Sequence, residues 1–340
     1  MKRFFLIGLI FIFLACASTP HKSSGIIYMQ QGLYNKAVIE FQGWVNENPN
    51  NPEAHLWLGR AYIGTREYIK AAEEFARAYE LDADSGKYAK EFGENEINTL
   101  LTAGKTLFQQ GDDKNALRYF EYASRINPKE ERAYLAIAII KSKQGNTEEA
   151  IKYVNKAIEI QPNDAQAYFY RAKFYSQAGE RDKAITDLQK ALEIDSTFSK
   201  AYFDLGALYF DNEQYEKAAQ AFIKAHQYDK NNDDAILNVA LSYYKLSNYG
   251  EAEKYYKIYL EKQPDAYDIW FYYAISLYNQ NKYMDALSAL DKAIEIKPDF
   301  EDAYSLKALI YNQLKMTKEL NETIKKIQEI QKSKGKNGGM

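Results

Sequence analysis

Cysteine is almost absent from this 340-residue chain, which contains Cys16 alone. A single thiol cannot form an internal disulfide, and the rest of the chain has no thiolate for a metal site. Proline and glycine are also scarce, at 7 and 17 residues, whereas tyrosine and phenylalanine number 30 and 17. Few helix-breaking residues and many aromatic ones are typical of a helical array, and the length favours several domains or one repeat array.

Histidine is also rare, with His21, His55 and His226 only. We predict that these three form no metal site, and the chain has neither a phosphate-binding glycine loop nor a Cys–His nucleophile. His55 is predicted to pack at an aromatic position, and His226 to be solvated near a helix end. The sequence therefore predicts no enzymatic activity and no cofactor.

Arginine is outnumbered by lysine, 9 to 35, and the formal net charge is only −3. Nucleic-acid-binding proteins usually have a basic surface and use arginine for specific base contacts. A DNA or RNA partner is therefore not predicted.

The first sixteen residues have the pattern of an export signal. Lys2 and Arg3 precede a 12-residue apolar run that ends at Ala15, which is shorter than the roughly 20 residues of a membrane span. The stretch before Cys16 resembles a bacterial lipoprotein signal, which implies that Cys16 becomes the first mature residue and carries the lipid. The alternative is that Cys16 is an ordinary small residue of the signal.

Small residues recur along the chain at a fixed interval. One series is Gly25, Gly59, Gly104, Ala138, Ala172, Gly206, Ala240, Ala274 and Ala308. A second series is Ala37, Ala71, Ala116, Ala150, Ala184, Ala218, Ala252 and Ala286. Each step is 34 residues, except that eleven residues are inserted between the second and third copies. Such periodicity predicts a solenoid of helix pairs, in which small side chains allow the helices to approach closely.

The copy that begins near Ser199 shows the pattern best. Tyr202, Leu205, Gly206 and Tyr209 form one helix face, and the Ala218 and Phe222 positions form the next. This pattern resembles the tetratricopeptide repeat. The resemblance implies an all-α, right-handed superhelical solenoid of antiparallel helix pairs that binds other proteins.

The resemblance and the interval give a domain organisation. The predicted segments are a signal peptide (1–15), an anchor tether (16–24) that contains His21, two repeat units (18–85), an insertion (86–96), six units (97–300), a terminal capping helix pair (301–331) and a disordered tail (332–340). Because the insertion breaks the interval, we expect the first two units to be offset from the seven that follow.

First helices of successive repeats line a concave groove in this family. The residues predicted to contact a partner there are Leu101, Leu135, Phe169, Phe203, Phe210, Leu237, Leu241, Tyr244, Phe271 and Tyr278. An apolar groove suits the hydrophobic face of an amphipathic helix. The alternative is that these side chains pack between neighbouring repeats.

The sequence thus predicts a scaffold, anchored to the bacterial envelope by lipid, that binds apolar segments of envelope or periplasmic proteins. No Asp follows Cys16, which favours the outer membrane if the source is Gram-negative. The alternative function is an accessory lipoprotein that captures a small hydrophobic ligand for a transporter.

Overall fold

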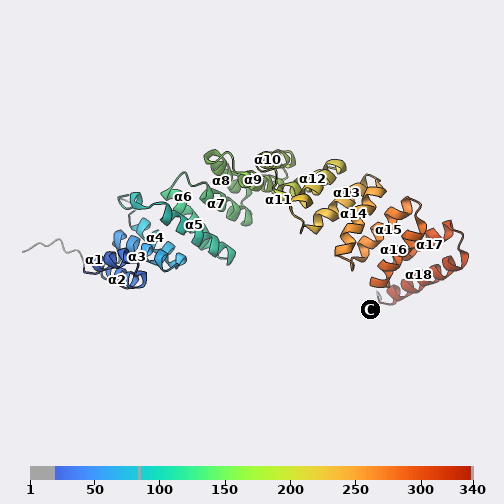
Figure 1. Cartoon of the computed structure of the whole chain (residues 1–340), viewed down its shortest axis with the longest axis horizontal. Helices are drawn as coiled ribbons and strands as arrows, with labels where there is room; N and C mark the ends of the chain where they lie inside the picture. Colours follow the sequence, from blue (N-terminus) through green and yellow to red (C-terminus); the bar gives the residue numbers. More distant parts are fainter. Residues whose placement is uncertain (1–19, 83–85, 338–340) are drawn as a thin grey trace, which may run out of the picture. The chain divides into compact units, whose positions relative to one another are not determined.

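A computed structural model of the protein describes residues 20–82 and 86–337. Within these residues it has eighteen α-helices, one 3₁₀ turn and no strand (Figure 1). The helices are α1 (Pro20–Gln30), α2 (Tyr34–Glu47), α3 (Pro52–Gly64), α4 (Tyr68–Leu81), α5 (Glu94–Gln109), α6 (Asp113–Ile126), α7 (Glu131–Lys143), α8 (Thr147–Ile160), α9 (Ala165–Gln177), α10 (Arg181–Ile194), α11 (Ser199–Asp211), α12 (Tyr215–Tyr228), α13 (Asp233–Lys245), α14 (Tyr249–Lys262), α15 (Tyr267–Asn279), α16 (Tyr283–Ile296), α17 (Glu301–Gln313) and α18 (Thr317–Asn337), with η1 (Ala89–Glu91) before α5. The predicted all-α fold of helix pairs is confirmed.

The chain divides into two compact units, the first ending at Pro162 and the second beginning at Asn163. In the first unit one apolar core runs from Leu56 in α3 to Ile140 in α7. In the second unit smaller cores join consecutive helices from α9 to α17. Each helix pair is thus stabilised chiefly by its neighbours within a unit, as in other repeat proteins.

The two helices of a pair meet where the small-residue series faces a large side chain sixteen residues later. Where the small residue is glycine the partner is phenylalanine, in the pairs Gly25–Phe41, Gly59–Phe75, Gly104–Phe120 and Gly206–Phe222. A Cβ added to any of these glycines would lie between 2.4 and 2.9 Å from its phenylalanine ring. Where the small residue is alanine the residue sixteen positions later is Val154, Leu188, Tyr256, Leu290 or Ile324. Except at Tyr256, the sizes of the two residues therefore compensate each other.

The turn inside each pair has one residue in the left-handed backbone region. In four turns this residue is Gly32, Gly111, Gly145 or Gly179. In the other five turns it is Arg66, Glu213, Ser247, Asn281 or Lys315, with φ between 56° and 63°. The backbone N–H of the residue after it donates to the carbonyl oxygen five residues earlier. For example, the N–H of Gln214 donates to the carbonyl oxygen of Tyr209 at 2.8 Å, and this hydrogen bond ends the helix. The turn geometry is therefore the same whether or not the residue is glycine.

The insertion is an ordered connection that is tied to the helices around it. The buried carboxylate of Asp82 accepts from the amides of Lys87 and Tyr88, at 3.1 and 2.7 Å. Phe92 is buried and packs edge-on against Phe75 of α4, with ring centroids 5.8 Å apart. The core of the first unit continues through Phe92 into α5 and α6, and the boundary between the compact units follows Pro162. The offset of the first two units stays a prediction.

The ends of the helical region differ from the predicted boundaries. α1 begins at Pro20, so residues 20–24 of the predicted tether belong to a helix, in which the buried Gly25 packs against Phe41. α18 continues to Asn337, so residues 332–337 of the predicted tail are helical. The predicted signal and Cys16 lie outside the described residues.

Candidate partner-binding groove

The ten residues predicted to line the groove all lie on the first helices of their pairs. Leu101 (α5) and Leu135 (α7) belong to the first unit. The second unit contains Phe169 (α9), Phe203 and Phe210 (α11), Leu237, Leu241 and Tyr244 (α13), and Phe271 and Tyr278 (α15). Nine of the ten are partly exposed, whereas Phe169 is buried in the core shared by α9 and α11. Phe169 is thus a packing residue in this structure.

Three aromatic side chains recur at the same place near the ends of α11, α13 and α15. Phe210, Tyr244 and Tyr278 each contact the tyrosine that begins the following helix. The centroid distances are 5.2 Å to Tyr215, 5.9 Å to Tyr249 and 5.7 Å to Tyr283. These contacts hold each ring in place while part of its surface remains accessible to solvent. The three rings therefore present similar apolar surfaces at intervals of one repeat.

The other groove residues of the second unit combine packing with partial exposure. Phe203 lies edge-on to Phe222 at 5.4 Å, and Phe271 lies edge-on to Phe300 at 5.1 Å. Leu237 and Leu241 pack on the core formed by α13 to α15. Packing between repeats and contact with a partner are therefore compatible for these four residues.

Two tyrosines were missed in the sequence prediction. Tyr272 packs edge-on against Tyr244 at 5.7 Å and stacks on Tyr256 at 6.4 Å. Tyr256 is fully buried, and its hydroxyl has no hydrogen-bond partner among the described residues, so burial raises its pKa strongly. The signal for Tyr256 was present in the sequence, because it is the one aromatic side chain sixteen positions after an alanine of the small-residue series.

A cavity of about 290 Å³ lies between α9 and α11 in the second unit. Ala172 and Leu188 form apolar parts of its wall, and Lys173, Asp204 and Asp211 add charge. Burial raises the pKa of the Asp204 carboxyl, and the positive charges of Lys173 and Lys200 offset part of that effect. A wholly apolar ligand would be a poor match for this lining.

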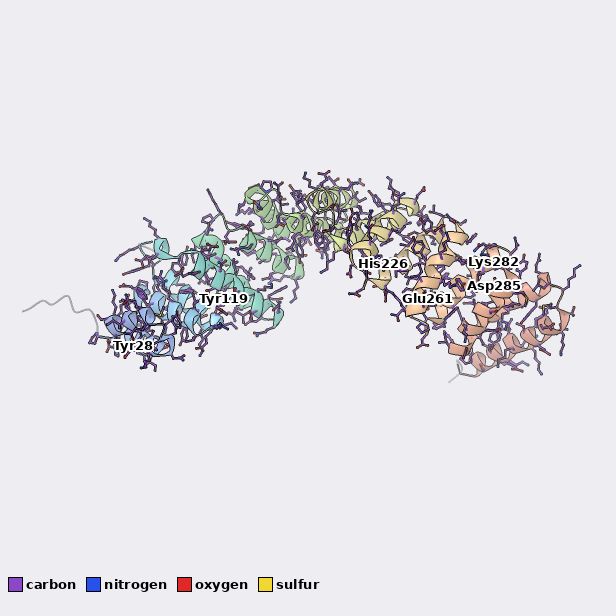
Figure 2. The ribbon with its side chains drawn as sticks, in the orientation of Figure 1. Tyr28, Tyr119, His226, Glu261, Lys282 and Asp285 are labelled. Carbon is purple, nitrogen blue, oxygen red and sulfur yellow. The ribbon has the colours of Figure 1, made fainter. Side chains whose placement is uncertain are left out.

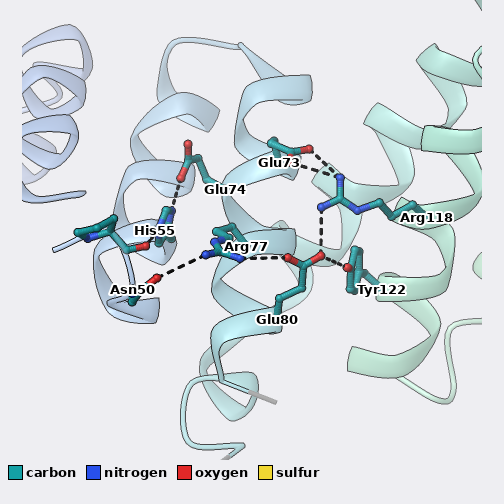
Figure 3. Close-up of polar contacts among 9 residues, drawn as sticks. Asn50, His55, Glu73, Glu74, Arg77, Glu80, Arg118 and Tyr122 are labelled. Carbon is teal, nitrogen blue, oxygen red and sulfur yellow. Dashed lines mark hydrogen bonds and ion pairs between the residues drawn. The ribbon is translucent and has the colours of Figure 1, made fainter. Parts of the chain in front are cut away.

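His21 and His55 occupy the same position in successive helix pairs, a relation that the sequence prediction missed. Each pairs through Nδ1 with a glutamate nineteen residues later, Glu40 at 2.8 Å and Glu74 at 2.6 Å. Figure 3 shows the contact between His55 and Glu74. Nε2 of His55 also lies 3.0 Å from the carbonyl oxygen of Pro49. His55 is buried and cross-links α3, α4 and the connection before α3.

The charge of His55 is expected to stabilise the first unit at low pH. Burial alone would lower its pKa, but the hydrogen bonds with Glu74 and Pro49 outweigh burial and raise the pKa above its usual value. The stabilisation should be complete below the unfolded-state pKa, about 6.5, and should decline as the pH rises through the higher folded-state pKa. Thermal unfolding followed between about pH 5 and pH 9 would measure this decline.

The matched control is His55→Phe, because other pairs have an aromatic residue at this position. The difference in melting temperature between the wild type and the variant should shrink with rising pH. A difference that is independent of pH would show that the proton on His55 does not contribute.

His226 was predicted to be solvated, and the structure differs. It is partly buried in α12, and this burial lowers its pKa (Figure 2).

Across residues 20–82 and 86–337, no group of three or more His, Cys, Asp or Glu side chains could hold a metal ion.

A charged network joins the second helices of two pairs in the first unit. Arg118 of α6 contacts Glu73 and Glu80 of α4, each at 3.1 Å (Figure 3). Tyr119 donates to Glu73 at 2.7 Å, and Tyr122 donates to Glu80. Partly exposed pairs of this kind contribute little individually, and together they link α4 to α6.

Family models match most of the helical region. Models described as tetratricopeptide repeat match residues 23–86, 107–173, 199–232 and 237–314, and one described as TPR repeat matches 172–213.

The chain belongs to the tetratricopeptide repeat family.

Solved structures of other tetratricopeptide repeat proteins resemble parts of the chain. YrrB, described as a TPR protein with an unusual peptide-binding site, is 28% identical, covering 52% of this chain and 92% of its own, with a TM-score of 0.47. A tetratricopeptide repeat protein from Parabacteroides merdae is 20% identical, covering 69% and 93%, with a TM-score of 0.46. MamA is 25% identical, covering 47% and 94%, with a TM-score of 0.44. No curated protein matches the chain.

Membership of the tetratricopeptide repeat family indicates a scaffold that binds other proteins, and proteins of this family are generally not enzymes. In these repeats the surface available for a partner consists of side chains that the repeat packing does not need. Phe210, Tyr244 and Tyr278 lie outside the small-residue series and the positions opposite it; each packs against a core of the second unit and remains partly exposed.

Proposed function

We propose that this tetratricopeptide repeat protein is an interaction scaffold of the bacterial cell envelope that binds an apolar helix or segment of its partners. The observation that carries the proposal is the row of partly exposed rings at Phe210, Tyr244 and Tyr278. An amphipathic helix presents apolar side chains at intervals of three to four residues and would offer several of them to such a row. Aromatic rings that are already held in place lose little conformational entropy on binding.

The charged cavity between α9 and α11 supports a polypeptide partner over a small hydrophobic ligand. Lys173, Asp204 and Asp211 would each need a polar partner if the groove were filled. A polypeptide can supply backbone amides and polar side chains beside its apolar ones. Competition between a fluorescent lipid probe and a candidate peptide would distinguish the two kinds of ligand.

The double variant Phe210→Ser/Tyr278→Ser tests the groove. Because neither side chain is fully buried, the variant should keep its helical circular dichroism, while capture of partners from envelope extracts should fall at least about tenfold. The matched control is Ile258→Ser/Met284→Ser, which removes exposed apolar side chains from the second helices α14 and α16. Retained capture combined with lower stability would show that the two rings serve only in packing.

We further propose that Cys16 carries a lipid and holds the protein to the membrane, with the outer membrane favoured in a Gram-negative source. The basic start, the short apolar run and the position of the chain's single cysteine support this anchor. None of the described helices is long and apolar enough to cross a bilayer. Two or more acyl chains on one residue are enough for stable anchoring.

Metabolic labelling tests the anchor. The wild-type chain should incorporate labelled palmitate, and Cys16→Ala should incorporate none, because no other thiol is present. Equal labelling of the two chains would rule out Cys16 as the modified residue.

A further inference from the structure

The first helix pair exposes more large apolar surface than its place in a repeat array requires. Ile27 of α1 is 51% exposed, Ile39 of α2 is 70% exposed, and Leu33 in the turn between them is 41% exposed. Single exposed apolar residues are ordinary in soluble proteins, whereas three in one helix pair need a reason.

The equivalent positions in later repeats show that Ile39 is unusual. The residues at its position are Glu73, Arg118, Lys152, Thr186, Gln220, Lys254, Ser288 and Glu322. All eight are polar, because this position faces outward on the second helix of a pair. The position of Leu33 is also polar in seven later copies and is Met316 in the last. Repeat packing therefore does not account for the apolar side chains of Ile39 and Leu33.

The position of Ile27 identifies the uncovered surface. Its later equivalents are Ala61, Thr106, Ile140, Phe174, Leu208, Ser242, Ser276 and Ile310, and all except Thr106 are buried. Similarly, Pro20 is exposed, whereas all eight residues at its position in later pairs are buried. The side of α1 that would face a preceding helix pair thus has no cover among the described residues.

The chain between Cys16 and α1 limits what can cover this surface. Only three residues separate Cys16 from Pro20, where α1 begins. Four residue steps reach at most about 14 Å, and a helix with its side chains is about 10–12 Å wide. If Cys16 is lipidated, the start of α1 at Pro20 is therefore held within about 14 Å of the bilayer surface.

We propose that the first helix pair lies against the lipid bilayer, with Ile27, Leu33 and Ile39 in contact with the boundary between headgroups and acyl chains. This rests on the proposed anchor at Cys16. The lipid supplies the attachment, and the apolar side chains fix the orientation of the first repeat on the membrane. Partly buried apolar side chains at this boundary typically insert by about 5–10 Å.

Depth-dependent fluorescence quenching in the membrane-anchored full chain tests the proposal. A fluorophore is placed at Asn35→Cys, between Leu33 and Ile39, because the lipid occupies the thiol of Cys16. The reference probe is Glu216→Cys, which has the same position in the sixth helix pair and is likewise exposed. Phospholipids with a nitroxide near the headgroup should quench the probe at residue 35 several-fold more strongly than the probe at residue 216.

The triple variant Ile27→Ser/Leu33→Ser/Ile39→Ser should lose this excess quenching while palmitate incorporation stays unchanged. The matched control, Ile258→Ser/Met284→Ser/Leu309→Ser, removes equally exposed side chains from the second unit and should leave the excess unchanged.

Equal quenching of the two probes in a palmitate-labelled wild type would overturn the docking proposal and leave the anchor intact. Failure of the wild type to incorporate palmitate would reject both. Energy transfer between chains that rises with protein density would show that a second copy covers the surface, which also overturns the proposal.

Discussion

Gly59→Ala is expected to lower the free energy of unfolding of the first unit by about 2–3 kcal/mol. The new methyl group would lie 2.4 Å from the ring of Phe75, which is fully buried and has no room to move. α3 and α4 would have to separate, or the ring would have to leave its favoured rotamer. Denaturant unfolding followed by circular dichroism would measure the loss.

A second substitution provides the internal control for this prediction. Phe75→Leu on its own should cost about 1–2 kcal/mol because it leaves a cavity. Combined with Gly59→Ala, it recreates the pair formed by Ala172 and Leu188, so the double variant should be more stable than the sum of the single losses predicts. Strictly additive losses would show that the two residues do not compensate for each other.

Asp187→Ala is expected to destabilise the second unit by about 3 kcal/mol, at the lower end of the range for buried ion pairs. Asp187 is buried and accepts two hydrogen bonds from the guanidinium of Arg171, at 2.7 and 2.8 Å. These bonds raise the pKa of Arg171 and tie α9 to α10. Removing the carboxylate takes the main counter-charge from a cation that is only partly exposed. Thermal and denaturant unfolding would measure the loss.

The next repeat shows how the same two positions are filled without charge. There Leu205 and Ala221 stand where Arg171 and Asp187 stand. Arg171→Leu/Asp187→Ala should therefore recover most of the stability lost in Asp187→Ala, because replacing both charges by apolar groups removes their desolvation cost. A double variant as unstable as Asp187→Ala alone would indicate that the ion pair itself is required.

The helix pairs could be predicted from the sequence because their packing repeats every 34 residues. Each small residue of the Gly25 series faces a large residue sixteen positions later, and both types are visible in the sequence. The left-handed turn residues were recognisable only where they are glycine. Glu213 and Ser247 adopt the same conformation because the helix ends on both sides impose it, and their side chains give no sign of it.

The groove residues were predictable as positions, whereas their exposure was not. Phe169 and Phe203 have the same position in consecutive repeats, yet only Phe169 is buried. Phe198, in the connection between α10 and α11, covers Phe169 at 4.9 Å. Tyr272 was missed because its role depends on Tyr244 and Tyr256, which come from two other helices. The first contact recurs between Phe271 and Phe300, three repeats later, whereas Phe271 remains partly exposed. Exposure therefore depends on the side chains of neighbouring helices as well as on the position in the repeat.

The division of each unit into cores shared by consecutive helices has a consequence for local opening. In the second unit, α13 shares cores with α12 and α14, whereas α18 has a neighbour on one side only among the described residues. Opening an interior pair breaks two interfaces, and opening the last pair breaks one. Amide hydrogen exchange in this unit should therefore be fastest in α18 and slowest around α13 and α14. The exchange rate of a helix should depend more on its position in the array than on its length.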